Sequence, residues 1–284
     1  MKNSRNKKSP PVERREIGSF APSAEEVFSH KPETETPAEV SEAVGGPNAV
    51  LAALKARGRS CRSLLAAEGR RGSKVVDEIF ALARALSLPI KISPRLALDR
   101  AYGSGGHQGI VAVFDKVNYG TEDSLLNLPP EGPVLLLALD KVEDPGNLGA
   151  LIRSACAFGA SAVLAAKDRT APLTPAALRA AAGAAETVPL VRVVNLRRSL
   201  ESLKDQGFWL VGADGDGSSD LAGFDFPERT VLVMGSEGKG LSAVIKKVCD
   251  FMLAIPQRRE AVSSLNVSVA GAILMCQYYR RHGR

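Results

Sequence analysis

The 284-residue chain lacks the residue patterns of a disulfide-stabilised, metal-binding or membrane-spanning protein. Its four cysteines, Cys61, Cys156, Cys249 and Cys276, are far apart, and none belongs to a CxxC sequence or a zinc-ligand pair. We therefore expect reduced, mostly buried thiols, a cytoplasmic location and no metal site. No run of about 18 or more apolar residues occurs, so no transmembrane helix is expected. The first residues also lack the apolar centre of a signal peptide.

Aromatic and histidine side chains are also scarce. Aromatic residues make up 5% of the chain and all hydrophobic residues 45%, so Ala, Val, Leu and Ile must fill most of the core. The three histidines, His30, His107 and His282, are far apart in the sequence. Histidine is the usual base in general acid–base catalysis, and the sequence therefore does not indicate such a base.

Positive charge is concentrated in one segment of the chain. The formal net charge is +6, and residues 45–115 carry 11 basic and 5 acidic side chains. Residues 1–44 carry 7 basic and 8 acidic side chains. Lysine and arginine release counterions when they neutralise phosphates, so the basic segment suits a nucleic acid partner. A basic surface without a specific partner is the alternative.

Composition divides the chain into a disordered tail at 1–43, a small α/β domain at 44–115, a linker at 116–132 and a larger α/β domain at 133–284. In the larger domain short apolar strands alternate with helices, which predicts a parallel sheet covered on both faces. Strands are expected at 61–66, 90–92, 110–114, 134–140, 162–165, 188–194, 208–213, 230–234 and 252–255. Helices are expected at 48–57, 75–86, 94–98, 147–158, 175–185, 196–204, 241–248 and 263–281.

Three polar loops follow expected strands of the larger domain, which is where ligands bind in open parallel sheets. In the first loop a turn at 144–146 precedes Asn147, which we expect at or near a helix N-cap. Arg153 lies six residues further along an otherwise apolar helix. An arginine there needs a partner or an anion, and a cap followed by a surface arginine is the simpler alternative.

The second loop, 231–242, contains three glycines in six residues around Glu237. Glycine lets the backbone approach a ligand closely, although an ordinary glycine-rich turn is equally consistent with the pattern. A P-loop is excluded, because Lys239 is followed by glycine and not by serine or threonine.

The third loop, at 255–275, leads into the C-terminal helix, and we expect Ser264 and Asn266 to cap that helix. Capping without any other role is the alternative. A fourth polar stretch, 214–220, has alternating aspartates but lacks the glycine and glutamate that an EF-hand requires. We expect it to be a polar loop and not a calcium site.

Together the three loops resemble the SpoU (TrmH) family of RNA ribose methyltransferases in the SPOUT superfamily. The matching strings are N-L-G-A-L-I-R at 147–153, V-M-G-S-E-G-K-G-L at 233–241 and the very specific S-L-N-V-S-V-A at 264–270. The strings GGPNAVLAAL at 45–54 and HQGIVA at 107–112 are similar to the family's N-terminal substrate-binding domain. The resemblance covers residues 44–284.

The resemblance implies a fold, a cofactor and an activity. The fold is α/β: a SPOUT-type parallel sheet with a C-terminal trefoil knot follows a small ribosomal-protein-like α/β domain, and the chain forms a homodimer. The activity is transfer of a methyl group from S-adenosylmethionine to a ribose 2′-OH of structured RNA, and the two-domain form implies a guanosine in 23S rRNA. The implied catalytic residues are Arg153, Asn147, Glu237, Ser264 and Asn266. The implied cofactor-binding residues are Gly235, Ile255, Leu265, Gly238 and Ala213.

The segment before Ser264 departs from the family pattern. Where the family has I-P-M-x-G-x-x-x ahead of S-L-N, this chain has I-P-Q-R-R-E-A-V-S, which is one residue longer and lacks the glycine. Arg258, Arg259 and Glu260 occupy this segment, which puts the family's cofactor contacts there in question. The two arginines could bind RNA phosphates or lie in solvent.

The proton acceptor and the RNA class stay open at this stage. Family mechanisms assign activation of the hydroxyl to Arg153, but a guanidinium is not deprotonated in proteins. We expect Arg153 to stabilise the developing alkoxide and hold a phosphate, with a phosphate, water or Glu237 taking the proton. His107 and Gln108 could contact RNA or form a structural turn. The alternatives are a tRNA ribose methyltransferase, an rRNA adenosine resistance methyltransferase, and a non-catalytic RNA-binding or ribosome-assembly factor.

Overall fold

The computed structural model describes residues 41–56, 60–70, 72–103, 105–117, 119–258 and 264–283. Most of the tail expected at 1–43 lies outside these residues, and so does His30. The end of the expected tail already belongs to strand β1 (Ser41–Gly45), so regular structure begins before Val44. No described helix is long and apolar enough to cross a membrane. The same residues contain no group of three or more His, Cys, Asp or Glu side chains that could hold a metal ion.

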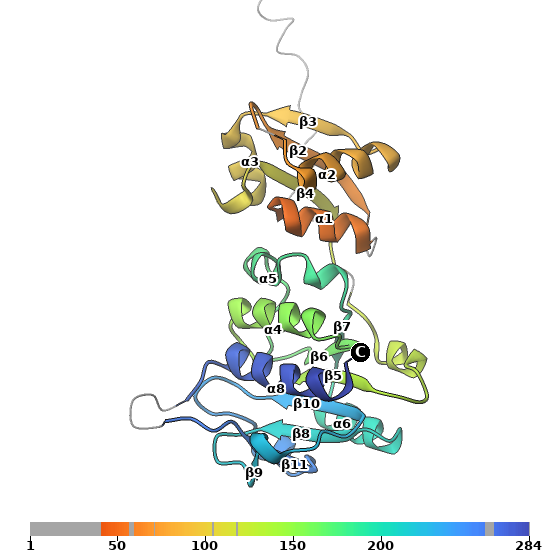
Figure 1. Cartoon of the computed structure of the whole chain (residues 1–284), viewed down its shortest axis with the longest axis vertical. Helices are drawn as coiled ribbons and strands as arrows, with labels where there is room; N and C mark the ends of the chain where they lie inside the picture. Colours follow the sequence, from red (N-terminus) through yellow and green to blue (C-terminus); the bar gives the residue numbers. More distant parts are fainter. Residues whose placement is uncertain are drawn as a thin grey trace, which may run out of the picture. The chain divides into compact units, whose positions relative to one another are not determined.

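A four-stranded sheet has the strand order β1-β4-β2-β3 (Figure 1). Its other members are β2 (Cys61–Ala67), β3 (Ile90–Ser93) and β4 (Ile110–Asp115). Strands β1 and β2 pair antiparallel with β4, and β3 pairs parallel with β2. Therefore β1, β2 and β3 run in the same direction and end at the same edge of the sheet.

Three helices cover this sheet. The helices α1 (Pro47–Ala56) and α2 (Lys74–Ala85) pack on one face, and α3 (Arg95–Tyr102) packs on the other. The helix expected at 75–86 is confirmed, because its apolar residues recur with helical spacing and its Ser73 cap accepts a hydrogen bond from the Val76 N–H. A helix does start within 94–98, as expected, and this helix, α3, ends at Gly103, whose φ is 78°.

A seven-stranded sheet has the order β7-β6-β5-β10-β8-β11-β9, and all its strand pairs are parallel. The strands are β5 (Val134–Leu139), β6 (Ala162–Ala166), β7 (Leu190–Val193), β8 (Trp209–Ala213), β9 (Ser219–Asp220), β10 (Arg229–Met234) and β11 (Phe251–Ala254). The six strands expected in this sheet are present, and the two-residue β9 is additional. The α/β fold with a parallel sheet is confirmed, and the knot stays a prediction.

Helices cover both faces of the seven-stranded sheet, as expected. The helices α4 (Pro145–Ala157) and α8 (Val267–His282) pack on one face, and α5 (Pro175–Ala181) packs against α4. The helices α6 (Leu196–Asp205) and α7 (Ala243–Lys246) pack on the other face. Strand β5 is buried on both faces, which explains why its six residues are all apolar.

The segment expected as a linker, 116–132, is partly folded onto the seven-stranded sheet. It contains the 3₁₀ helix η2 (Glu122–Asn127), whose Leu125 is buried in the same apolar cluster as α6. Gly120 forms a β-bridge with Val191 of β7. The segment is therefore more than a connection, and the domain boundaries stay a prediction.

The structure makes one capping prediction more exact and corrects another. The N-cap of α4 is Asp144, whose carboxylate accepts a hydrogen bond of 2.7 Å from the Asn147 N–H. Asn147 lies inside the first turn, because Pro145 at the first helical position moves the start of the helix upstream. At α8 the cap is Asn266 alone, and Ser264 precedes the helix.

Three smaller expectations also change. The helix expected at 241–248 is the short α7, and the polar stretch 214–220 contributes β9. The four cysteines are free, but all are partly exposed and not mostly buried. Burial and the nearby Asp250 raise the pKa of Cys249 to about 12, so this thiol stays protonated and unreactive at neutral pH.

His107 is a structural residue of the four-stranded sheet and does not contact solvent. Its side chain is fully buried; Nε2 lies 2.9 Å from Asp99 Oδ1, and Nδ1 accepts a hydrogen bond from the Gly109 N–H. The ring therefore donates from Nε2 to Asp99. Of the two roles left open for His107, the turn is correct and RNA contact is wrong, whereas Gln108 is exposed with a φ of 50°.

We predict that Gly149→Ala lowers the free energy of unfolding by about 1–3 kcal/mol through overpacking. A Cβ at Gly149 would lie 2.1 Å from the Ala177 carbonyl oxygen, so α4 and α5 would have to separate. Denaturant unfolding measures the change. Gly223→Ala is the control, since a Cβ there meets no atom within 4 Å. Equal stability of the two variants would contradict this account of the α4–α5 contact.

Candidate functional site

The three loops singled out in the sequence follow β5, β10 and β11 and lie at one edge of the seven-stranded sheet. Strand β10 lies between β5 and β8, and β8 lies next to β11. Met234 pairs with Leu139, and Leu253 pairs with Ala213, so the carboxyl ends of these strands coincide. The chain segments after them therefore surround one space, together with the loop after β8.

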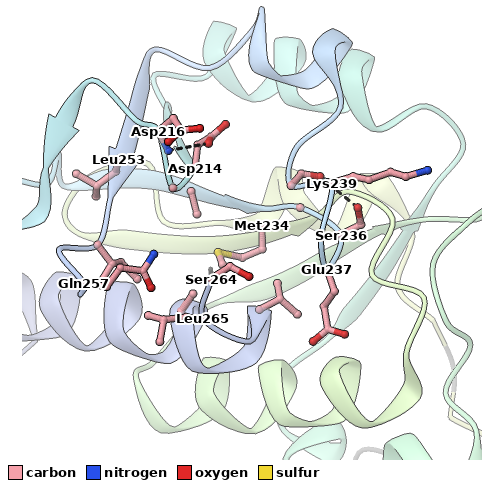
Figure 2. Close-up of a pocket in the computed structure, with 18 of the residues that line it drawn as sticks. Asp214, Asp216, Met234, Ser236, Glu237, Lys239, Leu253, Gln257, Ser264 and Leu265 are labelled. Carbon is pink, nitrogen blue, oxygen red and sulfur yellow. Dashed lines mark hydrogen bonds between the residues drawn. The ribbon is translucent and has the colours of Figure 1, made fainter. Parts of the chain in front are cut away.

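A cavity of about 370 Å³ occupies this space. Figure 2 shows Asp214 and Asp216 on one side, Gln257, Ser264 and Leu265 on the other, and Met234 between them. Its walls combine apolar side chains with carboxylate, amide and backbone groups, as is typical of small-molecule sites. The lining also includes Ala213, Gly235, Ser236, Glu237, Gly238, Lys239, Gly240, Lys246, Leu253, Ile255, Val267 and Ala270.

The glycine-rich loop forms one wall of the cavity as a tight turn. Ser236 and Gly240 exchange two backbone hydrogen bonds of 3.1 and 3.0 Å. Gly238 and Gly240 have φ values of 78° and 62°, which favour glycine. A Cβ at Gly235 would lie 2.2 Å from the Gly240 carbonyl carbon, so this position excludes every larger residue. The glycines thus have a backbone role that the sequence pattern left open.

Asp140 holds this turn in place. It follows β5, only 6% of its surface is exposed, and one carboxylate oxygen accepts a hydrogen bond of 2.7 Å from the Ser242 N–H. A buried carboxylate requires such a partner. The contact joins the first loop to the second, 102 residues later in the chain.

Asn266 connects the third loop to the other two. Its Oδ1 accepts hydrogen bonds from the Ser268 and Val269 N–H groups and so caps α8. Its Nδ2 donates to Asn147 Oδ1 at 2.9 Å and to Glu237 Oε1 at 2.5 Å. One side chain therefore fixes the start of α8 and joins α4 to the glycine-rich loop.

Arg153 lies outside the cavity lining, on α4. Its side chain is exposed and makes no hydrogen bond or ion pair with any described residue. It follows Asn147 by six residues, which is about 9 Å along the helix axis. The sequence predicts either a partner in the chain or an anion for Arg153. Because the described residues offer no partner, the guanidinium is available to an external anion.

Asp214 and Lys246 form an ion pair that lines the cavity next to β8. Burial raises the pKa of the Asp214 carboxyl, but the Lys246 ammonium and the Asp216 N–H lower it by more. The net effect is a lowered pKa, so Asp214 is ionised at neutral pH. The pair places one negative and one positive group at the cavity wall, and their charges cancel.

All five residues expected to bind a cofactor, Ala213, Gly235, Gly238, Ile255 and Leu265, line the cavity. Among the expected catalytic residues, Glu237 and Ser264 line it, and Asn147 and Asn266 are hydrogen-bonded beside it. The roles of these residues stay predictions.

Sequence reasoning missed several residues of this site: Asp140, Asp214, Lys246 and Gln257. An aspartate directly after a buried strand was the signal available for Asp140. Gln257 belongs to the departing segment and lines the cavity. Arg259 and Glu260 lie outside the described residues.

Two protein families match this chain, and together they cover most of the described residues. The SpoU rRNA Methylase family matches residues 134–276. The RNA 2′-O ribose methyltransferase substrate binding family matches residues 43–120.

Curated relatives align with most of this chain. The 23S rRNA (guanosine-2′-O-)-methyltransferase RlmB of Pseudomonas syringae pv. tomato is 41% identical over 243 residues, covering 84% of this chain and 96% of the relative. An uncharacterised tRNA/rRNA methyltransferase of Mycobacterium tuberculosis is 38% identical over 248 residues, covering 87% of this chain and 76% of the relative.

Solved structures share the fold. The SpoU methyltransferase AviRb of Streptomyces viridochromogenes, in complex with AdoMet, has a TM-score of 0.67 at 27% identity, covering 85% of this chain and 90% of the other. An AdoMet-bound rRNA methyltransferase of Sinorhizobium meliloti has a TM-score of 0.69 at 26% identity, covering 84% of this chain and 87% of the other.

We predict that Asn266→Ala and Asn266→Ser separate the two roles of this side chain. Alanine removes both the cap and the bridge and should lower the free energy of unfolding by about 1 kcal/mol. Serine keeps a capping oxygen, so its stability should stay closer to that of the wild type, while the amide that donates to both Asn147 and Glu237 is lost. Denaturant unfolding of both variants provides the comparison. If both are equally destabilised, Asn266 does not act as the cap described here.

Proposed function

The chain belongs to the SpoU rRNA methylase family, and on that premise we propose that it transfers a methyl group from S-adenosylmethionine to a ribose 2′-OH of structured RNA. The target we propose is a guanosine of 23S rRNA, the substrate in the name of the Pseudomonas relative. The supporting observation in this chain is the cavity at the carboxyl edge of the seven-stranded sheet, which lies beside the Asn147–Asn266–Glu237 hydrogen bonds.

The cavity fits S-adenosylmethionine in size and chemistry. Its volume of about 370 Å³ lies in the range of small-molecule sites. Met234, Leu253 and Ile255 offer apolar walls, and the backbone of the glycine-rich loop offers donors and acceptors. When bound, the sulfonium group supplies a methyl group that is already activated for transfer. The chain must then orient the ribose and stabilise its oxygen, and orientation can contribute about 7–11 kcal/mol.

We assign Arg153 to the reacting ribose. Its exposed guanidinium can donate hydrogen bonds to the developing alkoxide and to an adjacent phosphate. Glu237 and Ser264 lie at the cavity, and Asn266 orients the Glu237 carboxylate by a hydrogen bond. In this proposal Asn147 and Asn266 are positioning residues, because they act through Glu237 and α4.

The proposal includes features expected of the family. These are the C-terminal trefoil knot, a homodimer, a cytoplasmic location, and the division into a substrate-binding domain at 44–115 and a methyltransferase domain at 133–284. The basic residues of 45–115 support RNA binding by the first of these domains.

Mapping of 2′-O-methyl groups in total RNA from cells with and without the gene tests the proposal. We expect one guanosine of 23S rRNA to lose its methyl group when the gene is deleted. Loss of a methyl group from a tRNA position or from an rRNA adenosine would show that this nucleotide, and not a guanosine of 23S rRNA, is the substrate. An unchanged map, together with failure of the purified protein to bind S-adenosylmethionine, would favour a non-catalytic ribosome-assembly factor.

We predict that Arg153→Ala lowers kcat about 10²–10³-fold, the usual cost of removing one donor to a developing oxyanion. Because Arg153 is exposed, stability and S-adenosylmethionine binding should be unchanged. Transfer of labelled methyl to 23S rRNA measures kcat, and calorimetry measures cofactor binding. Arg198→Ala, at an exposed arginine of α6, is the control. Full activity of Arg153→Ala would reject the role given to this residue.

A further inference from the structure

One end of the four-stranded sheet brings together loops from four parts of the chain. Strands β1, β2 and β3 end there and β4 begins there. The Ala67 N–H donates to the Gly109 carbonyl at 2.9 Å, and the Glu68 N–H donates to the Ser93 carbonyl at 3.1 Å. We call this surface the loop end; its described parts are residues 45–48, 67–70, 72–74, 91–96 and 105–110.

Three helices begin at the loop end. Helix α1 follows β1, α2 follows β2, and α3 follows β3. A helix N-terminus carries partial positive charge and unpaired N–H groups. Neither α1 nor α3 has an acidic residue in its first turn, and Pro94 gives α3 no side-chain cap. The ends of these helices therefore favour an anion.

Basic side chains at the loop end have no acidic partner among the described residues. Lys74, Lys91 and Arg95 are exposed and form no ion pair. Arg70 is half-buried, and its Nε is buried without a hydrogen-bond partner. In contrast, Arg62 pairs with Asp115 at the opposite end of the sheet, and Lys55 pairs with Glu78 between α1 and α2.

The acidic groups near the loop end are fewer. Glu68 is exposed, Asp77 lies in the first turn of α2, and Asp99 is hydrogen-bonded to His107. Four basic side chains and three helix N-termini outweigh these three carboxylates. The balance at this surface is positive.

Two large apolar side chains stand exposed beside these charges. Ile92 is 62% exposed and Leu96 is 60% exposed, on either side of the turn that joins β3 to α3. Scattered exposed apolar residues are common, but here Ile92 directly follows Lys91 and Leu96 directly follows Arg95, so apolar and basic side chains alternate at one turn. An aliphatic side chain there can pack against the face of a nucleobase.

We infer that RNA docks on the loop end, with phosphates at Lys74 and Arg95 and an unpaired base against Ile92 and Leu96. The inference deepens the proposed function and rests on it for the identity of the RNA. Unpaired nucleotides fit better than a duplex, since single-stranded segments expose base faces as well as phosphates. A ribosomal protein is the other possible occupant, and the experiment below separates it from RNA.

Filter binding of the full chain to a 23S rRNA transcript, over a range of KCl concentrations, tests the inference. Arg95→Gln should weaken binding about fivefold, and Lys74→Gln with Arg95→Gln should weaken it about tenfold or more. The slope of log K against log salt should fall by about 0.7 for each phosphate contact to single-stranded RNA. Ile92→Ser should weaken binding without changing the slope.

Arg84→Gln is the matched control, because Arg84 is an exposed arginine in the last turn of α2, away from the loop end. It should weaken binding less than twofold. If Arg95→Gln and Ile92→Ser behave like Arg84→Gln, the inference is wrong. If the variants lose affinity for the intact large ribosomal subunit but not for the naked transcript, the occupant is a ribosomal protein, which also overturns it.

Methyl transfer by the same variants separates this inference from the proposed function. We expect kcat/KM for 23S rRNA to fall with RNA affinity, while kcat at saturating RNA and S-adenosylmethionine binding stay unchanged. If the wild type transfers no methyl group but its RNA binding depends on Arg95 and Ile92, the result supports the docking surface and rejects the proposed reaction. If the wild type transfers methyl groups and the variants bind RNA and react as well as the wild type, the result rejects the docking surface and supports the proposed reaction.

Discussion

The parallel register of β5, β10, β8 and β11 is the constraint on which the functional site depends. These strands are almost entirely apolar and lie between two layers of helices, so a slip in register would expose core residues. The register places four loops at one edge, although Asp140 and Ser242 are 102 residues apart. The position of the cavity is therefore set by core packing, and the loops only shape its walls. This explains why short, weak loop patterns can form a specific site when they occur on this sheet.

Asn266 shows how the fold and the site share the same interactions. Its Oδ1 satisfies the first N–H groups of α8, which would otherwise lack partners, and its Nδ2 is left to hold Asn147 and Glu237. Helix α8 also packs closely on α4, since a Cβ at Gly271 would lie 2.5 Å from Leu151. The cap and the close packing together keep the amide of Asn266 between the two loops. Asparagine suits this position because ionised aspartate would cap the helix without providing a donor, and serine has only one O–H for the two acceptors.

Periodicity in the sequence predicted the strands, most helices and the edge at which the loops meet, because buried elements leave strong patterns. Periodicity did not predict the details that depend on the preference of a single residue or on the burial of a single side chain. Asn147 lies near the N-cap of α4 but is not the cap, which is Asp144, because Pro145 favours the first helical position. His107 followed a glycine pair and suggested a loop contact, but burial and the Asp99 hydrogen bond made it part of the core. The Asp140–Ser242 and Asp214–Lys246 contacts were beyond prediction, since they join residues far apart in the chain.

The difference in exposure across the site has a mechanistic consequence. Asn147 is buried, and Gly235 lies behind the glycine-rich turn, but Arg153, Glu237, Ser264 and Asn266 are exposed. A guanidinium in water interacts weakly with an alkoxide, because the solvent screens the charge. Removal of that water strengthens the interaction, and among the described residues no segment covers these four side chains. In the proposed reaction the RNA itself must exclude the water. Tight, oriented RNA binding would then be part of catalysis, and the RNA docking that we propose for the loop end would meet that requirement.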